Sequence, residues 1–302
     1  MRLSNHSTKG LSFVFLSALM FGSYGVWSRL IGPYFDIFYQ GWTRSLLVAL
    51  VLLPILIYRK EIVSIKKEDW GWMFVYLVFT SLTQAPLFYA FNHMDIGTAT
   101  LLFFVSMLLT MYAVGFIFLK EQLTFMKALA FLIACTGLYI TFSFSITTFA
   151  ILAALMAILN GAASGGEVSF SKKLNGSYST LYLTWLSWVI IVITNGIASF
   201  ALGETQLLPT LTLPWFYLIG YAIASLLGFW FVIEGFKYVE ASIGGLLGLL
   251  EIIFSISFGL LIFHEGLTLR VIIGAALILV AASLPHISEL MQRRTQKVSS
   301  AA

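Results

Sequence analysis

Long apolar segments separated by short polar loops follow one another along the chain and limit the folds it can adopt. A transmembrane helix needs about 20 mostly apolar residues to cross ~30 Å of hydrocarbon. Because the loops leave no room for a soluble domain, the sequence predicts an all-α integral membrane protein with ten transmembrane helices. The ten segments lie near residues 10–31, 36–58, 70–92, 96–119, 124–145, 148–170, 178–202, 213–236, 242–263 and 268–287.

Composition excludes several other classes of protein. Hydrophobic residues make up 60% of the chain and charged residues 10%, whereas roughly a quarter of the residues of a soluble domain are charged. The Lys and Arg residues lie in short clusters between apolar segments, which argues against a nucleic-acid partner. A single cysteine, Cys135, allows neither a disulfide framework nor a thiolate metal cluster. We therefore expect a protein of the lipid bilayer with no metal and no cofactor.

The distribution of positive charge predicts the orientation. With the N-terminus inside, fourteen of the 17 Lys and Arg residues lie on the cytoplasmic side, two lie outside, and Arg44 lies within the second segment. Lys and Arg accumulate in cytoplasmic loops, so both termini are expected in the cytoplasm, in a multi-pass protein of the cell membrane. The apolar N-terminal stretch lacks a convincing small-x-small cleavage site and is interpreted as a retained first span, not a signal peptide.

A short segment occurs twice, as "LKEQLT" at 119–124 and as "FHEGLT" at 263–268. A tight turn with a helix cap explains either copy alone, whereas two copies 144 residues apart suggest a duplication. Five crossings separate the copies, so the halves 1–145 and 146–302 are expected to have opposite orientations. Inverted repeats of this kind are found in secondary transporters, whose sites lie near the midplane of the membrane at the repeat interface.

The ten spans, the five-plus-five duplication and the "LLGLLE" start of the ninth segment resemble EamA-type members of the drug/metabolite transporter superfamily. The resemblance extends over essentially the whole chain. It implies a solute carrier of the cytoplasmic membrane that works without a nucleotide-hydrolysing partner. The implied partner is a small-molecule substrate such as an amino acid, an amine or a drug-like solute, and a homodimer is left open.

Carboxylates within the apolar segments are candidates for a functional site, because a charge at the bilayer centre costs about 2.5–3.5 kcal/mol on insertion scales. Glu251 lies too deep in the ninth segment for its short side chain to reach the interface. Glu167 lies nearer the cytoplasmic boundary, and a purely structural role for it is equally open. Glu234, one turn before Lys237, is expected to form a surface ion pair.

The second and third segments add further candidates for binding a solute or an ion. Gln40 and Arg44 are four residues apart and share one helix face, with Trp42 between them. Gln84 lies deep in the third segment. Each has a structural alternative: Arg44 fixed to loop carbonyls or directed outward, Gln84 bonded to another helix, and Trp42 facing lipid.

Two GxxxG pairs permit close approach between helices, and we expect them to pack helices and not to bind solute. They are Gly161 with Gly165, and Gly244 with Gly248.

These observations favour a secondary transporter that works by alternating access and is coupled to protons through Glu251. A uniporter or a channel-like facilitator of the same fold is the alternative. An intramembrane enzyme is disfavoured, because the sequence has no HExxH motif, no Gly-Ser-Gly elbow and no paired carboxylates with a nearby His.

Overall fold

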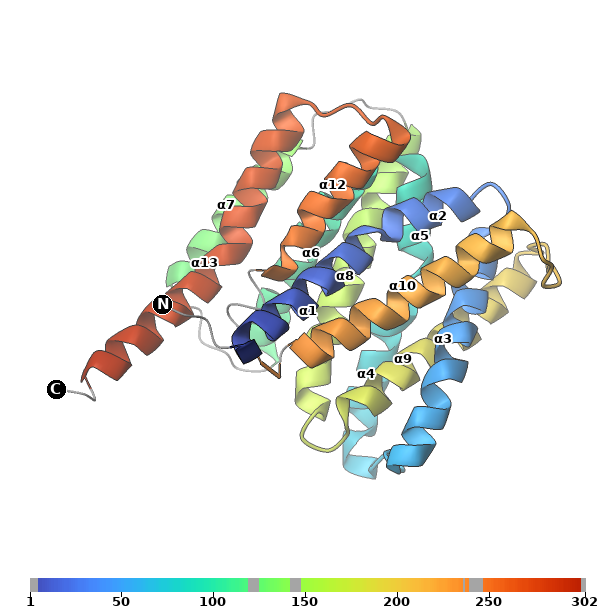
Figure 1. The fold of residues 1–302 in the computed structure, drawn as a ribbon, viewed down its shortest axis with the longest axis horizontal. Helices are drawn as coiled ribbons and strands as arrows, with labels where there is room; N and C mark the ends of the chain where they lie inside the picture. The colour runs from blue at the N-terminus through green and yellow to red at the C-terminus, as the bar shows by residue number, and fades with distance from the viewer. Residues whose placement is uncertain (1–4, 119–124, 142–147, 236, 239–246, 300–302) are drawn as a thin grey trace. The chain divides into compact units, whose positions relative to one another are not determined.

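The computed structural model describes residues 5–118, 125–141, 148–235, 237–238 and 247–299, and the regular structure within these ranges is helical throughout (Figure 1). One turn of 3-10 helix, η1 (Lys67–Asp69), precedes α4. For these residues the expectation of an all-helical protein is confirmed. The helices are α1 (Asn5–Gly22), α2 (Tyr24–Ile31), α3 (Ile37–Arg59), α4 (Trp70–Ser81), α5 (Ala85–His93), α6 (Ile96–Ile117), α7 (Phe125–Thr141), α8 (Thr148–Leu174), α9 (Thr180–Ala201), α10 (Leu213–Gly235), α12 (Leu250–Phe263) and α13 (Leu269–Ser299).

Within the described residues, seven helical stretches are long and apolar enough to cross a membrane. They are Thr8–Ile31, Ile37–Arg59, Lys67–His93, Ile96–Ile117, Ile151–Leu174, Thr180–Ala201 and Leu213–Gly235. Three shorter apolar helical stretches cover Ala128–Gly137, Leu250–Phe263 and Leu269–Ala281. Each of the ten segments expected from the sequence overlaps one of these stretches. The count of ten crossings and the position of the termini stay predictions.

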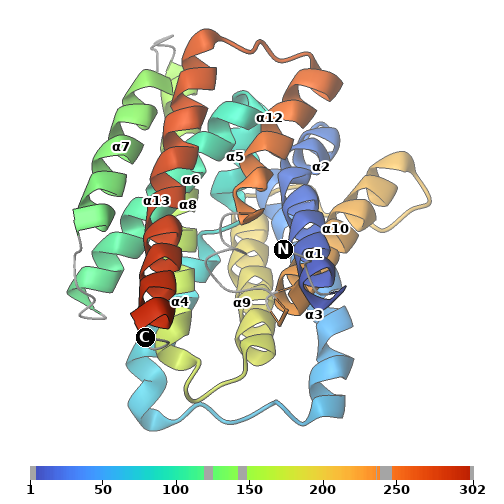
Figure 2. The same ribbon diagram turned by 60° about the vertical axis from the view of Figure 1, so that its left-hand side comes forward.

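The helices form two compact units, each built from segments that are far apart in the sequence. The α7–α13 unit comprises Met1–Tyr24, Gln122–Ser145 and Ala224–Ala302, and the α3–α9 unit comprises Gly25–Glu121 and Ile146–Ile223. In the α7–α13 unit, α1 packs against α12, and α7 lies beside α13 (Figure 2). In the α3–α9 unit, α8 packs against α4, α5 and α6, while α9 packs against α3 and α4.

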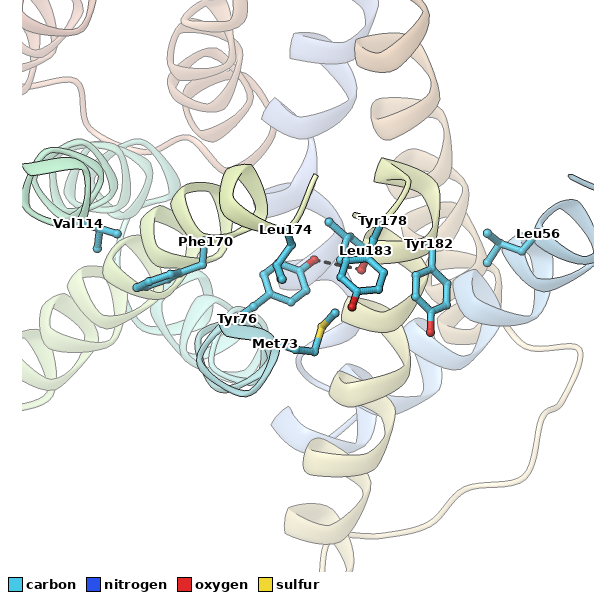
Figure 3. Packing of buried hydrophobic residues seen from close by; sticks show 9 residues of the cluster. All are labelled: Leu56, Met73, Tyr76, Val114, Phe170, Leu174, Tyr178, Tyr182 and Leu183. Atoms are coloured by element: carbon cyan, nitrogen blue, oxygen red, sulfur yellow. Dashed lines mark hydrogen bonds between the residues drawn. The ribbon is translucent and has the colours of Figure 1, made fainter. Parts of the chain in front are cut away.

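A cluster of buried apolar and aromatic side chains lies between the helices of the α3–α9 unit (Figure 3). Because lipid tails are as apolar as these side chains, close van der Waals packing holds such helices together inside a membrane. The Tyr76 hydroxyl adds a hydrogen bond of 3.0 Å to the Leu183 carbonyl. The cluster consists of Leu56, Met73, Tyr76, Val114, Phe170, Leu174, Tyr178, Tyr182 and Leu183.

Glycines let α8 approach the backbone of α6. A Cβ atom added at Gly161 would overlap the main-chain oxygen of Phe103, and one added at Gly165 would lie 2.5 Å from the main-chain oxygen of Met107. Any larger residue at these positions would push the two helices apart. Among the described residues nothing lies within 4 Å of a Cβ added at Gly248, whose packing role stays a prediction, and Gly244 lies outside the described residues.

The third apolar segment, expected as one helix over 70–92, is broken where α4 ends at Ser81 and α5 begins at Ala85. Pro86 lies in the first turn of α5, and in a continuous helix its ring would clash with the carbonyl four residues earlier. Side-chain donors satisfy carbonyls at the break, because Thr83 Oγ1 donates to the Thr80 carbonyl (2.8 Å) and Asn160 Nδ2 donates to the Thr83 carbonyl (2.6 Å). The break therefore places polar groups inside an apolar span.

Candidate solute and coupling site

Arg44 is the centre of a polar and aromatic cluster within the α3–α9 unit. Its side chain is fully buried, and its Nη2 atom donates a hydrogen bond to Oε1 of Gln84, at the break between α4 and α5. The guanidinium carbon lies 3.9 Å from the ring centre of Tyr221, 5.1 Å from that of Phe88 and 5.4 Å from that of Trp188. A cation within about 6 Å of an aromatic face is attracted to it. We call these five residues the Arg44 centre.

The sequence singled out Arg44 and Gln84 in separate segments, and the structure joins them by a hydrogen bond. The alternative of an outward-directed Arg44 does not hold, because none of its side chain is exposed. Sequence reasoning missed Phe88 and Tyr221. Phe88 lies four residues after Gln84 on the same face of α5, so helical spacing was the available signal. No comparable signal marks Tyr221 on α10.

Gln40 and Trp42 have different surroundings. Gln40 is fully buried, its Nε2 atom donates to the Phe35 carbonyl (3.4 Å), and its Oε1 atom has no hydrogen-bond partner among the described residues. The Trp42 ring meets the Tyr39 ring edge-on at 5.5 Å. Trp42 is therefore not one of the rings around Arg44, although it lies only two residues away.

Glu167 on α8 belongs to a second polar cluster of the same unit. Its Oε1 atom accepts a hydrogen bond from the Ser187 hydroxyl (2.8 Å), and that hydroxyl lies 2.5 Å from the Tyr76 hydroxyl. The Leu183 carbonyl oxygen lies 3.1 Å from the same hydroxyl oxygen. The carboxylate is thus held between α8 and α9, an arrangement that suits both the structural and the functional interpretation.

Glu251 lies in the α7–α13 unit, in the first turn of α12, and is partly exposed. Its backbone packs against α1: a Cβ atom added at Gly22 would lie 2.6 Å from the Phe254 Cβ and 3.1 Å from the main-chain oxygen of Glu251. The Ser255 hydroxyl donates to the Gly22 carbonyl (3.2 Å). The close contact with Gly22 therefore fixes the main chain at Glu251.

Two further expectations concern charged groups. The surface pair of Glu234 with Lys237 is confirmed, with Nζ 2.6 Å from Oε2. Across the described residues, no group of three His, Cys, Asp or Glu side chains is arranged to hold a metal ion.

Comparison with known proteins agrees with this architecture. The sequence model of the EamA-like transporter family matches residues 8–143 and 151–284. No curated protein matches the chain. One solved structure, titled only as the crystal structure of a protein, is 16% identical, covers 95% of this chain and 99% of its own, and superposes with a TM-score of 0.63. At that identity the likeness shows the fold alone. Because the family model matches most of the sequence in two consecutive copies, the chain belongs to the EamA-like transporter family.

Proposed function

We propose that this chain is a secondary transporter that carries a small metabolite or drug-like solute across the cell membrane by alternating access. Membership of a transporter family supports transport. The Arg44 centre is the observation that carries the proposal of a solute site, because it combines a buried cation, a buried amide and three aromatic rings. Such groups bind an anionic or carbonyl group and stack on a planar one.

We also propose that residues 1–145 and 146–302 are two oppositely inserted repeats, with ten crossings and both termini in the cytoplasm. The two matches to the family model begin at residues 8 and 151, which are 143 residues apart. The repeated segments at 119–124 and 263–268 have nearly the same spacing. These two spacings support a duplication, and the positive charges support the orientation.

Glu251 is the proposed coupling residue. A carboxylate inside an apolar helix of a transporter costs free energy, and binding a proton or a cationic solute removes that cost. A proton and a solute that compete for one carboxylate give obligatory exchange. A uniporter of the same fold is the remaining alternative.

Counterflow in proteoliposomes tests whether the chain is a carrier. Proteoliposomes that contain the purified protein are loaded with an unlabelled pool of amino acids and quaternary amines. The same pool is then added outside in radiolabelled form. A carrier gives saturable counterflow, whereas a channel gives flux that does not saturate. Absence of counterflow for every class of solute would contradict the assignment as a carrier.

The coupling is tested by the same flux with and without a pH gradient. Glu251→Gln should abolish pH-driven flux and leave the protein folded, while the matched surface variant Glu234→Gln should keep it. Equal pH-driven flux in Glu251→Gln and the parent protein would reject coupling through Glu251.

A further inference from the structure

The antiparallel helices α3 and α9 are joined at one end by the carboxylate of Glu204. This residue follows α9, and its two oxygens accept the main-chain N–H groups of Phe38 (3.1 Å) and Tyr39 (2.7 Å) in the first turn of α3. The Tyr39 hydroxyl reaches back and donates to the Leu207 carbonyl (2.5 Å). A carboxylate at a helix N-terminus satisfies free N–H groups and complements the helix dipole. We call this set of contacts the Glu204 clamp.

The other ends of the same two helices are joined by the carboxylate of Glu61. This residue follows α3, and its Oε2 atom accepts a hydrogen bond (2.6 Å) from the hydroxyl of Ser179, the residue that caps α9 by accepting the N–H of Tyr182 (3.1 Å). The Tyr182 hydroxyl donates to the Val63 carbonyl (2.9 Å). We call this set the Glu61 clamp.

Tyr178 strengthens the Glu61 clamp. Its hydroxyl donates to Asp69 Oδ2 and accepts the main-chain N–H of Lys66, both at 2.9 Å. Tyr178, just before α9, thus bonds to η1 and to the residue that precedes it.

The two clamps correspond residue by residue at a constant separation of 143. The left-handed residue that ends each helix is Lys60 (φ 55°) in one case and Gly203 (φ 70°) in the other, and the glutamate follows it directly. In both, the N–H of the glutamate bonds to the carbonyl five residues earlier, at 3.1 Å for Glu61 and 2.9 Å for Glu204.

The capping residues and the tyrosines keep the same separation. The equivalent pairs are Asp36 with Ser179, Tyr39 with Tyr182, Lys60 with Gly203, and Glu61 with Glu204. Each tyrosine lies three residues after its cap and reaches the chain just beyond the opposite glutamate. The separation equals that between the starts of the two family matches. Residues at equivalent positions therefore join both ends of one helix pair, through main-chain N–H donors at Glu204 and through the Ser179 hydroxyl at Glu61.

We infer that Glu61 and Glu204 hold α3 and α9 as one rigid pair, which moves as a single body during transport, so that no solute path opens between these two helices. This inference rests on the proposed function. Two charge-assisted clamps at opposite ends leave no free end about which one helix swings away from the other. Arg44 on α3 and Trp188 on α9 are then carried together, which keeps this part of the Arg44 centre assembled.

A disulfide between the two helices tests the rigid pair. A Cβ atom added at Gly41 would lie 3.5 Å from the Cβ of Asn195, within the range that a disulfide requires. Gly41→Cys with Asn195→Cys, in a Cys135→Ala background, should crosslink on oxidation. The oxidised protein should carry the tracer pool of amino acids and amines within about twofold of the reduced protein, because no step of the cycle separates these helices.

Loss of counterflow on oxidation, with recovery on reduction, would overturn the rigid pair and leave the transporter assignment intact. Absence of counterflow in the Cys135→Ala parent would contradict the proposed function. If the Cys135→Ala parent shows no counterflow, or if the reduced double variant is inactive, the rigid pair is tested by a measurement that needs no solute.

That measurement is the distance between spin labels at each clamp, in lipid nanodiscs at pH 5 and pH 8. The label pairs replace the exposed residues Tyr34 and Leu208 at the Glu204 clamp, and Tyr58 and Gly176 at the Glu61 clamp. Each pair should give one narrow distribution at both pH values. Glu204→Ala should broaden only the first pair, and Glu204→Gln, which keeps one acceptor oxygen, should broaden it less.

Glu61→Ala should broaden only the second pair, and Glu234→Ala, outside the α3–α9 unit, should broaden neither. The inference would be overturned if either label pair gave two distance populations while both glutamates were intact. It would also be overturned if both alanine variants kept a narrow distance distribution.

Discussion

Two helix crossings, one in each unit, make the same contact between a glycine and the opposite backbone, and a carboxylate lies at only one of them. On α8, a Cβ atom at Gly165 would meet the main-chain oxygen of Met107 and the Cβ of Thr110. On α1, a Cβ atom at Gly22 would meet the main-chain oxygen of Glu251 and the Cβ of Phe254. The glycines are 143 residues apart and the residues they meet are 144 apart, so Met107 and Glu251 occupy equivalent positions.

The difference shows that this crossing does not need a carboxylate. The shared part is the contact of a glycine with the opposite backbone, which requires a missing side chain and accepts any residue whose side chain points elsewhere. Methionine fills the position at one crossing without the cost of a charge, whereas glutamate incurs that cost at the other. Packing therefore explains Gly22 and Gly165, and it does not explain Glu251. A coupling role for Glu251, as proposed above, would explain it.

Replacing Glu251 by methionine, the residue at the equivalent position, should have the largest effect. Glu251→Met should lower pH-driven flux at least about tenfold and raise the free energy of unfolding by up to about 2.5–3.5 kcal/mol, because the crossing keeps its contacts and loses a charge. Flux is measured in proteoliposomes and stability by unfolding in mixed micelles. Loss of stability in this variant would show that the carboxylate is structural.

The reverse exchange should have the opposite effect on stability. Met107→Glu should lower the free energy of unfolding by about 2.5–3.5 kcal/mol, because it introduces a charge at a position where the protein has no use for it. The same unfolding assay measures the change, and the pH dependence of flux should stay as in the parent. A variant as stable as the parent would show that both crossings accept a carboxylate equally.

The glycines should be equally sensitive in the two crossings. Gly165→Ala and Gly22→Ala should each lower the free energy of unfolding by about 1–3 kcal/mol, because the added methyl group overlaps a packed neighbour. Gly71 on α4 is the matched control: it is exposed with nothing near its Cβ position, so Gly71→Ala should gain about 0.5–1 kcal/mol. A gain at Gly165 or Gly22 would break the proposed equivalence.

Ser255 should give the smallest effect. Its hydroxyl bonds to the Gly22 carbonyl, while the equivalent residue of the other crossing is Met111. Ser255→Ala should lower the free energy of unfolding by about 0.6 kcal/mol, the mean found for hydrogen bonds between membrane helices. A much larger loss would mean that the α1–α12 crossing depends on this bond as well as on glycine.

The sequence anticipated some of these elements and missed others for identifiable reasons. The apolar segments agree with the helices because segment length against membrane thickness is a property of composition. The breaks at Ser23 and at Leu82–Gln84 were missed, although Pro86 was a visible signal for the second. Gly165 stood out in a GxxxG pair, whereas its equivalent Gly22 has no glycine partner four residues away.

The residues of the candidate site were also predicted only in part. Arg44, Gln84, Glu167 and Glu251 stand out because charged and amide groups are rare in apolar segments. Their partners did not stand out: Tyr221 is one aromatic residue among many, and Ser187 is one of many small polar residues. The clamp residues Glu61 and Glu204 lie in polar loops, where a glutamate attracts no notice.

The order of residues was enough to predict that the chain is helical, that it belongs in a membrane, and which ionisable groups lie deep in its spans. These properties depend on local composition and length, which the order of residues states directly. Three findings needed the packed helices: Arg44 meets Gln84 and Tyr221, Glu61 and Glu204 join the ends of one helix pair, and Met107 corresponds to Glu251. A helix that is apolar on all sides carries little periodic signal for the direction it faces, so its partners are set by packing between segments far apart in the chain.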